Sequence, residues 1–236
     1  MTEQSTPAPS LLDDPARAAA VGAAIERIQP GMTIGLGSGR AVFGLVEAIV
    51  KRWGQGAGFR AAVASDRTAA LAQAAGIEIV ELAGDTTLDV VIDGADEIDP
   101  DLNLVKGGGA ALLREKLVVS AANRFIVIAE AGKQVERLGV SFALPVEVVR
   151  FAWGDTRKRV LGLLPTATLR TGPDGRPVVT DENHHILDCA LPAADLPGLA
   201  RALKGTVGVV EHGLFLGMAS EALLGKPDGT LVELRR

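Results

Sequence analysis

Apolar residues in this 236-residue chain gather in short runs that alternate with segments of helical periodicity. The run Leu88–Ile92 shows almost no alternation of apolar and polar positions, which is typical of a strand buried on both faces. Such strands, alternating with helices, indicate a parallel sheet that is covered by helices on both sides. We predict strands at Thr33–Leu36, Phe59–Ala64, Ile77–Leu82, Leu88–Ile92 and Phe125–Ala129, and helices at Asp13–Ile28, Arg40–Lys51, Thr68–Ala75 and from Ala110 onward.

The pattern changes after Pro145. The segment Gly172-Pro173-Asp174-Gly175 is a strong turn signal between two short strands. The predicted order is strand–helix–strand–strand–helix–strand, which is the split-βαβ arrangement. Its elements are strands at Val146–Phe151, Ala167–Thr171, Pro177–Thr180, His185–Leu191 and Val207–Glu211, and helices at Thr156–Leu164 and Leu196–Leu203.

These patterns divide the chain into two predicted domains and a leader. The N-terminus is polar and contains two prolines, and we expect residues 1–12 to form a disordered leader. The tail from Gly213 has a last apolar segment and a Pro-Asp-Gly turn, and we expect it to return to the first domain. The larger α/β domain is therefore predicted at residues 13–142 plus 213–236, and the smaller α+β domain at residues 143–212.

Composition and charge exclude several classes of protein. The formal charge is −5 with dispersed Lys and Arg residues, which argues against nucleic-acid binding. No apolar run approaches the ~20 residues of a membrane helix, and the N-terminus lacks the features of a secretory signal, so we expect a cytoplasmic protein without membrane contact. Cys189 is the single cysteine, which excludes an intrachain disulfide and a cysteine metal cluster. The three histidines form no H-E-x-x-H pattern, and we predict no metal site.

The first candidate for chemistry is the glycine-rich segment Gly35-Leu36-Gly37-Ser38-Gly39, which joins a predicted strand to a predicted helix. Free backbone N–H groups and the positive end of a helix favour an anion such as phosphate at this position. Arg40 occupies the sixth position of the G-x-G-x-x-G pattern, so the segment is not the dinucleotide fingerprint, and no Walker G-K-[ST] follows. A tight turn without a ligand is the alternative.

The second candidate is the acidic segment Val91–Glu97, which follows the buried strand. Ligands of α/β sheets bind at the carboxyl ends of parallel strands. Asp93 and Asp96 lie three positions apart around Gly94, whose missing side chain permits close approach. The two carboxylates could accept hydrogen bonds from sugar hydroxyls or hold a metal. A solvated acidic turn is the alternative.

The third candidate is V-K-G-G-G-A-A-L-L-R-E-K-L-V-V-S, residues 105–120. Lys106 brings a cation to the same end of the sheet, and the three glycines form a bare turn that can face ligand oxygens. On the helix that follows, the lateral neighbours of Glu115 are apolar, so burial should raise its pKa and suit it to general-base catalysis. The alternative is a salt bridge between Glu115 and a neighbouring lysine or arginine.

The order, spacing and wording of these segments resemble type A ribose-5-phosphate isomerase. The specific strings are V-I-D-G-A-D-E-I, V-K-G-G-G-A-A-L-L-R-E-K and I-A-E-A-G-K-Q-V. Further similar strings are Q-P-G-M-T-I-G-L-G-S-G, A-S-D-R-T-A-A-L-A-Q-A-A-G-I, L-P-V-E-V and G-K-P-D-G, so the likeness covers nearly the whole chain beyond the leader.

The resemblance implies interconversion of D-ribose 5-phosphate and D-ribulose 5-phosphate in the pentose phosphate pathway, without metal or cofactor. It also implies a Rossmann-like larger domain, a smaller ferredoxin-like domain, and assembly as homodimers or tetramers. Glu115 would accept and donate the proton through an enediolate, and Lys106 would help to stabilise the oxyanion. The implied sugar site comprises Asp93, Gly94, Ala95, Asp96, Lys106, Gly107, Gly108, Gly109 and Lys133, and the implied phosphate loop comprises Ser38, Gly39, Arg40 and Ala41.

The sequence departs from the family in the phosphate loop, and it offers two carboxylates for ring opening. The family usually has G-T-G-S-T in the phosphate loop, whereas this chain has Ser38, Arg40 and Ala41, so the identity of the phosphate ligands is in question. Either Asp93 or Asp96 could move the proton that opens the furanose ring. Two other classes of protein fit the sequence less well. A sugar-phosphate sensor of the kind fused to transcription regulators would require a DNA-binding helix-turn-helix, and the residues before Gly35 are too few for one. A nicotinamide-dependent dehydrogenase is disfavoured by Arg40 in the glycine pattern.

Overall fold

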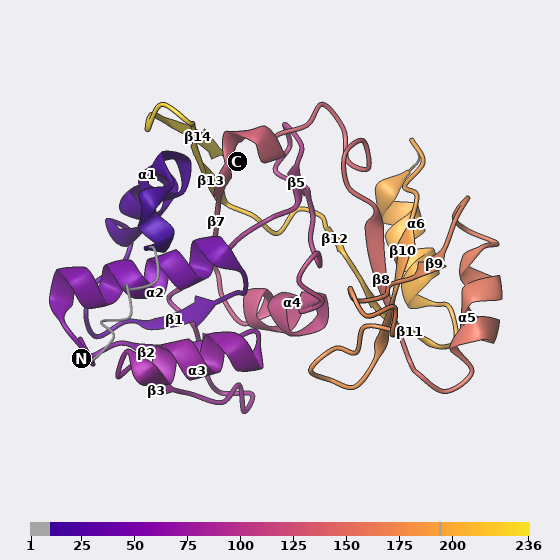
Figure 1. Ribbon diagram of the computed structural model, residues 1–236, viewed down its shortest axis with the longest axis horizontal. Coiled ribbons are helices and arrows are strands. Elements are labelled where there is room, and N and C mark those ends of the chain that lie inside the picture. The colour runs from indigo at the N-terminus through magenta and orange to yellow at the C-terminus, as the bar shows by residue number, and fades with distance from the viewer. Residues whose placement is uncertain (1–9, 194) are drawn as a thin grey trace, which may run out of the picture.

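The computed structural model describes residues 10–193 and 195–236 (Figure 1). Its largest feature is a seven-stranded sheet in the order β14-β13-β7-β4-β1-β2-β3. Every neighbouring pair is parallel except β13 and β14, so the predicted parallel sheet is present. Its strands are β1 (Thr33–Leu36), β2 (Arg60–Val63), β3 (Glu78–Ile79), β4 (Val90–Asp93), β7 (Phe125–Glu130), β13 (Glu221–Gly225) and β14 (Leu231–Arg235).

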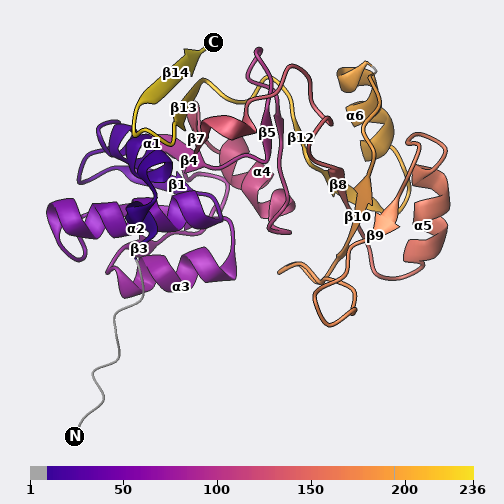
Figure 2. The same ribbon diagram turned by 45° about the horizontal axis from the view of Figure 1, so that its top comes forward.

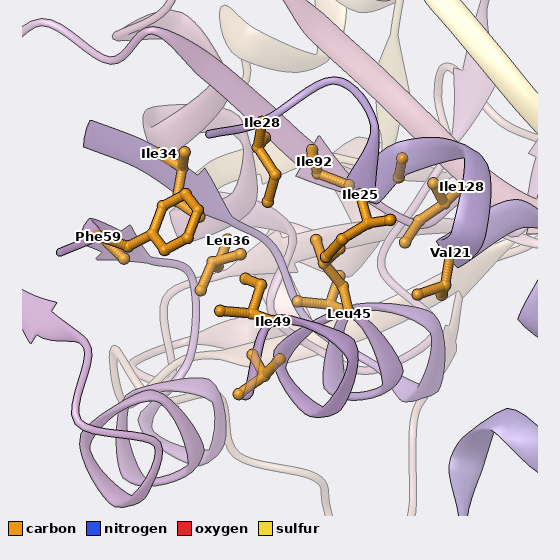
Figure 3. Close-up of a cluster of buried hydrophobic side chains, with 14 of the residues drawn as sticks. Val21, Ile25, Ile28, Ile34, Leu36, Leu45, Ile49, Phe59, Ile92 and Ile128 are labelled. Carbon is orange, nitrogen blue, oxygen red and sulfur yellow. The ribbon is translucent and has the colours of Figure 1, made fainter. Parts of the chain in front are cut away.

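Helices cover both faces of this sheet, as the apolar strands predict. One face carries α1 (Pro15–Ile25), α2 (Arg40–Trp53) and α3 (Asp66–Ala74), and the other carries α4 (Leu112–Ser120). Figure 3 shows the first of these cores, in which aliphatic side chains of two helices meet those of the central strands. Its labelled members are Val21, Ile25, Ile28, Ile34, Leu36, Leu45, Ile49, Phe59, Ile92 and Ile128.

The second sheet has four antiparallel strands in the order β11-β8-β10-β9. This order and the chain sequence β8-α5-β9-β10-α6-β11 are those of the predicted split-βαβ arrangement. The two helices pack against the sheet over a separate apolar core. The elements are β8 (Leu144–Val148), α5 (Trp153–Val160), β9 (Thr168–Leu169), β10 (His185–Cys189), α6 (Leu196–Lys204) and β11 (Val209–His212).

A small third sheet lies between the other two and was not predicted (Figure 2). It comprises β5 (Glu97–Ile98), β6 (Leu104–Val105) and β12 (Leu214–Phe215). The carboxylate of the buried Glu97 accepts bonds from the backbone N–H groups of Gly139, Ser141 and Phe142. These strands have two residues each, which is too short for a period-2 pattern to be visible in the sequence.

Several predicted boundaries differ from the structure. Helix α5 begins at Trp153 rather than at residue 156, because Ala152 has a left-handed backbone (φ 52°) that separates it from β8. No strand forms at 177–180; an isolated bridge joins Thr171 to Pro177, and the backbone N–H of Val178 donates to the Arg170 carbonyl oxygen at 2.9 Å. The predicted leader also ends earlier than residue 12. Ser10 caps a short 3-10 helix, η1 (Leu11–Asp13), while residues 1–9 lie outside the described part of the chain.

Candidate active site

A cavity of about 160 Å³ lies where β1, β4 and β7 end. This is the edge of a parallel sheet at which α/β proteins place their ligands. The structure brings together at this cavity nearly all the residues that the sequence singled out. The lining residues are Ser38, Gly39, Arg40, Ala41, Gly94, Ala95, Asp96, Lys106, Gly107, Gly108, Gly109, Glu115, Ile128, Ala129, Glu130 and Lys133.

Lys106 lies at the centre of a buried charge cluster on the floor of this cavity. Its ammonium Nζ is 2.8 Å from Asp93 Oδ2 and 3.2 Å from Glu115 Oε2, and it donates to the Gly94 carbonyl oxygen at 2.7 Å. The side chains of Lys106, Asp93 and Glu115 are 3%, 0% and 7% exposed. Glu115 thus forms the salt bridge that was the alternative prediction for it. That salt bridge is part of the site, because both partners line the cavity.

Asp93 is held beneath the cavity rather than in its wall. Its Oδ1 accepts hydrogen bonds from the backbone N–H groups of Ser38 (3.1 Å) and Gly94 (2.7 Å). A Cβ atom on Gly37 would lie 1.8 Å from the Asp93 carboxyl carbon, so only glycine fits at that position. The glycine segment after β1 therefore allows a carboxylate at the end of β4 to reach the floor of the site.

Burial governs the protonation of this cluster. It raises the pKa of Glu115 to about 8, with further raising by the Asp93 charge and opposition from the Lys106 ammonium. Burial also raises the pKa of Asp93, again against the effect of Lys106. One cation therefore serves two buried carboxyls. Asp93 has two additional N–H donors, so we assign the shared negative charge to Asp93 and the exchangeable proton to Glu115.

The glycine turn before α4 provides backbone donors next to Glu115. Gly107 has a left-handed backbone (φ 112°), and the backbone N–H of Gly108 donates to Asp96 Oδ2 at 2.8 Å. A Cβ on Gly108 would lie 2.7 Å from Asp96 Oδ1, so this close approach needs glycine. Asp96 thus braces the turn while it lines the cavity, unlike the more deeply buried Asp93.

The first turn of α2 forms another wall of the cavity. Its N-cap residue, Gly39, makes no side-chain capping bond, and the exposed side chain of Arg40 follows it. A second cavity of about 250 Å³ continues from here, and Arg67 lies in its wall with its guanidinium 4.6 Å from the centre of the Phe43 ring. Two arginines and a helix N-terminus therefore place positive charge at this end of the site, an arrangement that favours anions in proteins.

The sequence did not identify three of the lining residues. They are Ile128, Ala129 and Glu130 at the end of β7, directly before η2 (Ala131–Lys133), which contains the predicted site residue Lys133. The signal was present, because the carboxyl end of a predicted central strand belongs to the ligand edge of the sheet.

Neither a metal centre nor a membrane helix is found in the described part of the chain. Within residues 10–193 and 195–236, no group of three or more His, Cys, Asp or Glu side chains is arranged to hold a metal ion. In the same residues, no helix has the length and apolar character needed to cross a membrane.

The fold and the site define a class of protein: an α/β enzyme with a small cavity at the carboxyl edge of its parallel sheet, where a buried lysine lies between two carboxyl groups. Comparisons with known proteins specify the family. Residues 61–229 match the family model described as ribose 5-phosphate isomerase A (phosphoriboisomerase A). The chain therefore belongs to the ribose 5-phosphate isomerase A family, which confirms the resemblance found in the sequence, and it is an isomerase.

Individual relatives agree with this assignment. Ribose-5-phosphate isomerase A of Synechococcus sp. (strain JA-3-3Ab) is 49% identical over 219 residues, which cover 92% of this chain and 95% of the relative. The solved ribose 5-phosphate isomerase from Plasmodium falciparum has a TM-score of 0.88 at 35% identity, covering 95% and 99% of the two chains. A D-ribose-5-phosphate isomerase in complex with phospho-erythronic acid has a TM-score of 0.86 at 32% identity, covering 93% and 97%.

Proposed function

We propose that Glu115 carries the proton between C1 and C2 when this enzyme interconverts D-ribose 5-phosphate and D-ribulose 5-phosphate. The observation that carries the proposal is the cluster of Glu115, Lys106 and Asp93 at the cavity, in which a single cation faces two buried carboxyls. A pKa of about 8 lets Glu115 exist in both protonation states near neutral pH. One carboxylate can then remove the proton from one carbon and return it to the other.

The proton transfer creates an enediolate whose negative oxygen needs donors. Lys106 and the backbone N–H groups of Gly107 and Gly109 are the donors that this part of the cavity offers, while the Gly108 N–H is bonded to Asp96. Because these groups are fixed before the substrate binds, they stabilise the developing charge without reorganisation. The Asp93 carboxylate keeps Lys106 charged and in place, since it lies 2.8 Å from the ammonium group.

Asp96 is the better candidate for opening the furanose ring. It lines the cavity, and its carboxylate is tied by one described bond, from the Gly108 N–H. Asp93 lies below the cavity wall and is 0% exposed, with its oxygens facing Lys106 and two N–H donors. We therefore assign to Asp96 the proton transfer at the ring oxygen or anomeric hydroxyl, and to Asp93 the role of counter-charge.

The phosphate group would lie at the first turn of α2. Ser38, Gly39, Arg40 and Ala41 line this end of the cavity, and Arg40 would replace a family hydroxyl by a charge-assisted contact. Lys133 lies across the same cavity as a further cation for the substrate. Arg40→Ser should raise the KM for ribose 5-phosphate by about 10- to 100-fold, the range for loss of a hydrogen bond to a charged group. An unchanged KM at low and moderate salt would remove Arg40 from the phosphate site.

The direct test is incubation of purified, EDTA-treated protein with ribose 5-phosphate while ketopentose formation is followed. We expect turnover without added metal or nicotinamide, because acid–base chemistry accounts for the whole reaction. Turnover that requires a divalent ion would contradict the proposal and indicate a metal at Asp93 and Asp96. Phospho-erythronic acid, which a structural relative binds, should inhibit competitively, because its planar carboxylate resembles an enediolate.

Homodimeric or tetrameric assembly and a cytoplasmic location remain predictions from the resemblance. We propose them together with the function, and light scattering of the purified protein would test the first of them.

A further inference from the structure

Three consecutive charged residues of α4 point to three different parts of the molecule. Glu115 faces the cavity, Lys116 bonds to Glu211 of β11, and Arg114 reaches the turn that joins β9 to β10. Helix α4 lies between the two main sheets in both views (Figures 1 and 2). Arg114 therefore connects α4, the helix that carries Glu115, to the smaller domain. The proposed mechanism gives this arginine no role.

Arg114 joins three segments that are distant in the sequence. Its Nη1 donates to Asp66 Oδ1 at 2.6 Å, and its Nε donates to Glu182 Oε1 at 2.6 Å. Asp181 Oδ2 lies 3.4 Å from Nη1 and also accepts the backbone N–H of Asp66 at 3.0 Å. The guanidinium thus ties the turn of residues 179–183 to the first residue of α3.

Both anchored segments border the phosphate end of the site. The turn and the start of α3 supply Thr180, Asp181 and Ser65 to the wall of the 250 Å³ cavity, which continues from the substrate cavity at Ser38 and Arg40. Ser65, directly before Asp66, places its Oγ 3.1 Å from Ser38 Oγ. Movement of the turn away from α3 would therefore open one wall of this cavity. It would also loosen the start of α3, where Ser65 contacts Ser38 of the phosphate loop.

The turn is braced internally, so it would move as a unit. Thr180 Oγ1 donates to Glu147 Oε1 at 2.9 Å and accepts the backbone N–H of His184 at 3.1 Å. Asn183 Oδ1 accepts from Arg150 at 2.5 Å. These bonds hold the turn to the smaller domain, whereas Arg114 and the Asp66 N–H hold it to helices α4 and α3 of the larger one.

We propose that Arg114 is a positioning residue: an ionic clamp that holds the turn of residues 179–183 against α3 and thereby keeps the phosphate end of the site closed. The proposal rests on the proposed function, since its kinetic effect is measured on ribose 5-phosphate. Because the carboxylates of the clamp are partly exposed, salt should weaken it.

The test compares Arg114→Gln, Arg114→Lys and Glu182→Gln with the wild-type protein. Arg114→Gln should raise the KM for ribose 5-phosphate about tenfold and leave kcat within about threefold, because the base and its lysine are untouched. Arg114→Lys should recover part of the loss. Glu182→Gln should raise KM less than Arg114→Gln does, and its side chain is exposed enough that folding should not suffer. The matched control is Arg52→Gln, which breaks an exposed pair between α2 and Glu26 at the end of α1, outside both cavities, and should leave KM unchanged.

Hydrogen exchange of residues 178–184 tests the clamp without reference to catalysis. We expect faster exchange there in Arg114→Gln than in the wild type or in Arg52→Gln, and wild-type exchange that quickens with salt. Unchanged exchange and unchanged KM in both Arg114→Gln and Glu182→Gln would overturn the clamp. A wild-type protein that does not isomerise ribose 5-phosphate would instead overturn the proposed function, and the exchange data would still decide on the clamp.

Discussion

Two neighbouring residues of α4, Glu115 and Lys116, belong to two different buried clusters. One cluster raises the pKa of its glutamate, and the other lowers it. In the cavity cluster, Glu115 shares one ammonium group with Asp93, and burial raises its pKa to about 8. In the second cluster, Glu211 lies 2.8 Å from the ammonium of Lys116 and 3.0 Å from that of Lys204. Glu211 also accepts the His212 backbone N–H at 2.9 Å.

The count of charges explains the difference between the two carboxyls. Burial disfavours the ionised form of Glu211 too, but the attraction of Lys116 and the hydrogen bonds outweigh it and lower the pKa to about 2. For His212, burial and the positive charge of Lys116 both lower the pKa, to about 4, so this imidazole is neutral at pH 7. The second cluster is therefore fixed in one charge state and stabilises the fold. The cavity cluster has one cation too few, which leaves a proton free to move.

The largest expected effect comes from exchanging the two carboxyls for amides and comparing activity. Glu115→Gln should lower kcat by at least ~10²-fold with little change in substrate binding, because it removes the base and keeps the shape. Glu211→Gln should leave kcat within a few-fold, since its partners lie outside the cavity. Steady-state kinetics on ribose 5-phosphate measure both. Turnover of Glu115→Gln within threefold of wild type would refute the assignment of the base.

The order of the two variants should reverse when stability is measured, with Glu211→Gln destabilised more than Glu115→Gln. A pKa lowered from 4.5 to about 2 in the folded protein corresponds to about 3 kcal/mol of stabilisation by ionised Glu211. This stabilisation is complete above pH 4.5 and is lost as the pH falls toward 2. Glu211→Gln should therefore lower the free energy of unfolding by about 3 kcal/mol at pH 7, and the deficit should shrink in acid. Urea unfolding at several pH values measures it, and a deficit that does not change with pH would contradict the account.

Much of the cavity cluster was predictable from sequence, and the second cluster was not. Ligands of α/β proteins bind at the carboxyl ends of parallel strands. The sequence alone places Asp93, Lys106 and Glu115 after strands or glycine turns at that edge. The Lys116–Glu211 pair joins residues 95 positions apart, and its geometry depends on how the smaller sheet packs on α4. No hydrophobic pattern along the chain indicates that packing, and none indicates the two-residue strands β5, β6 and β12 that lie between the sheets.

Local backbone geometry accounts for the boundary errors. The sequence placed Ala152 in the break between strand and helix but began the helix three residues too late, because nothing in an alanine indicates the left-handed backbone from which α5 begins at Trp153. The sequence does not explain why Gly37 and Gly108 must be glycines. In the structure, a side chain at either position would collide with a carboxylate from another segment.

A smaller effect should follow from changing the charge count within the cavity cluster. The Asp93 charge is the second largest cause, after burial, of the raised pKa of Glu115. In Asp93→Asn, Lys106 has Glu115 as its single close carboxylate partner, and the pKa of Glu115 should fall. The acidic limb of the kcat/KM profile should then move to lower pH by about one unit, whatever activity remains. Glu211→Gln is the matched control and should not move the limb; a limb that stays in place in Asp93→Asn would mean that the two carboxyls do not interact.

The most direct test of the central claim is the pH dependence of kcat/KM for ribose 5-phosphate in the wild-type enzyme. This quantity reports the ionisation of the free enzyme, in which Glu115 must be deprotonated to act as the base. We predict that kcat/KM rises with pH along a limb with an apparent pKa near 8, well above that of the substrate phosphate at ~6. A profile that is flat from pH 6 to 9, or the same limb in the residual activity of Glu115→Gln, would contradict the account.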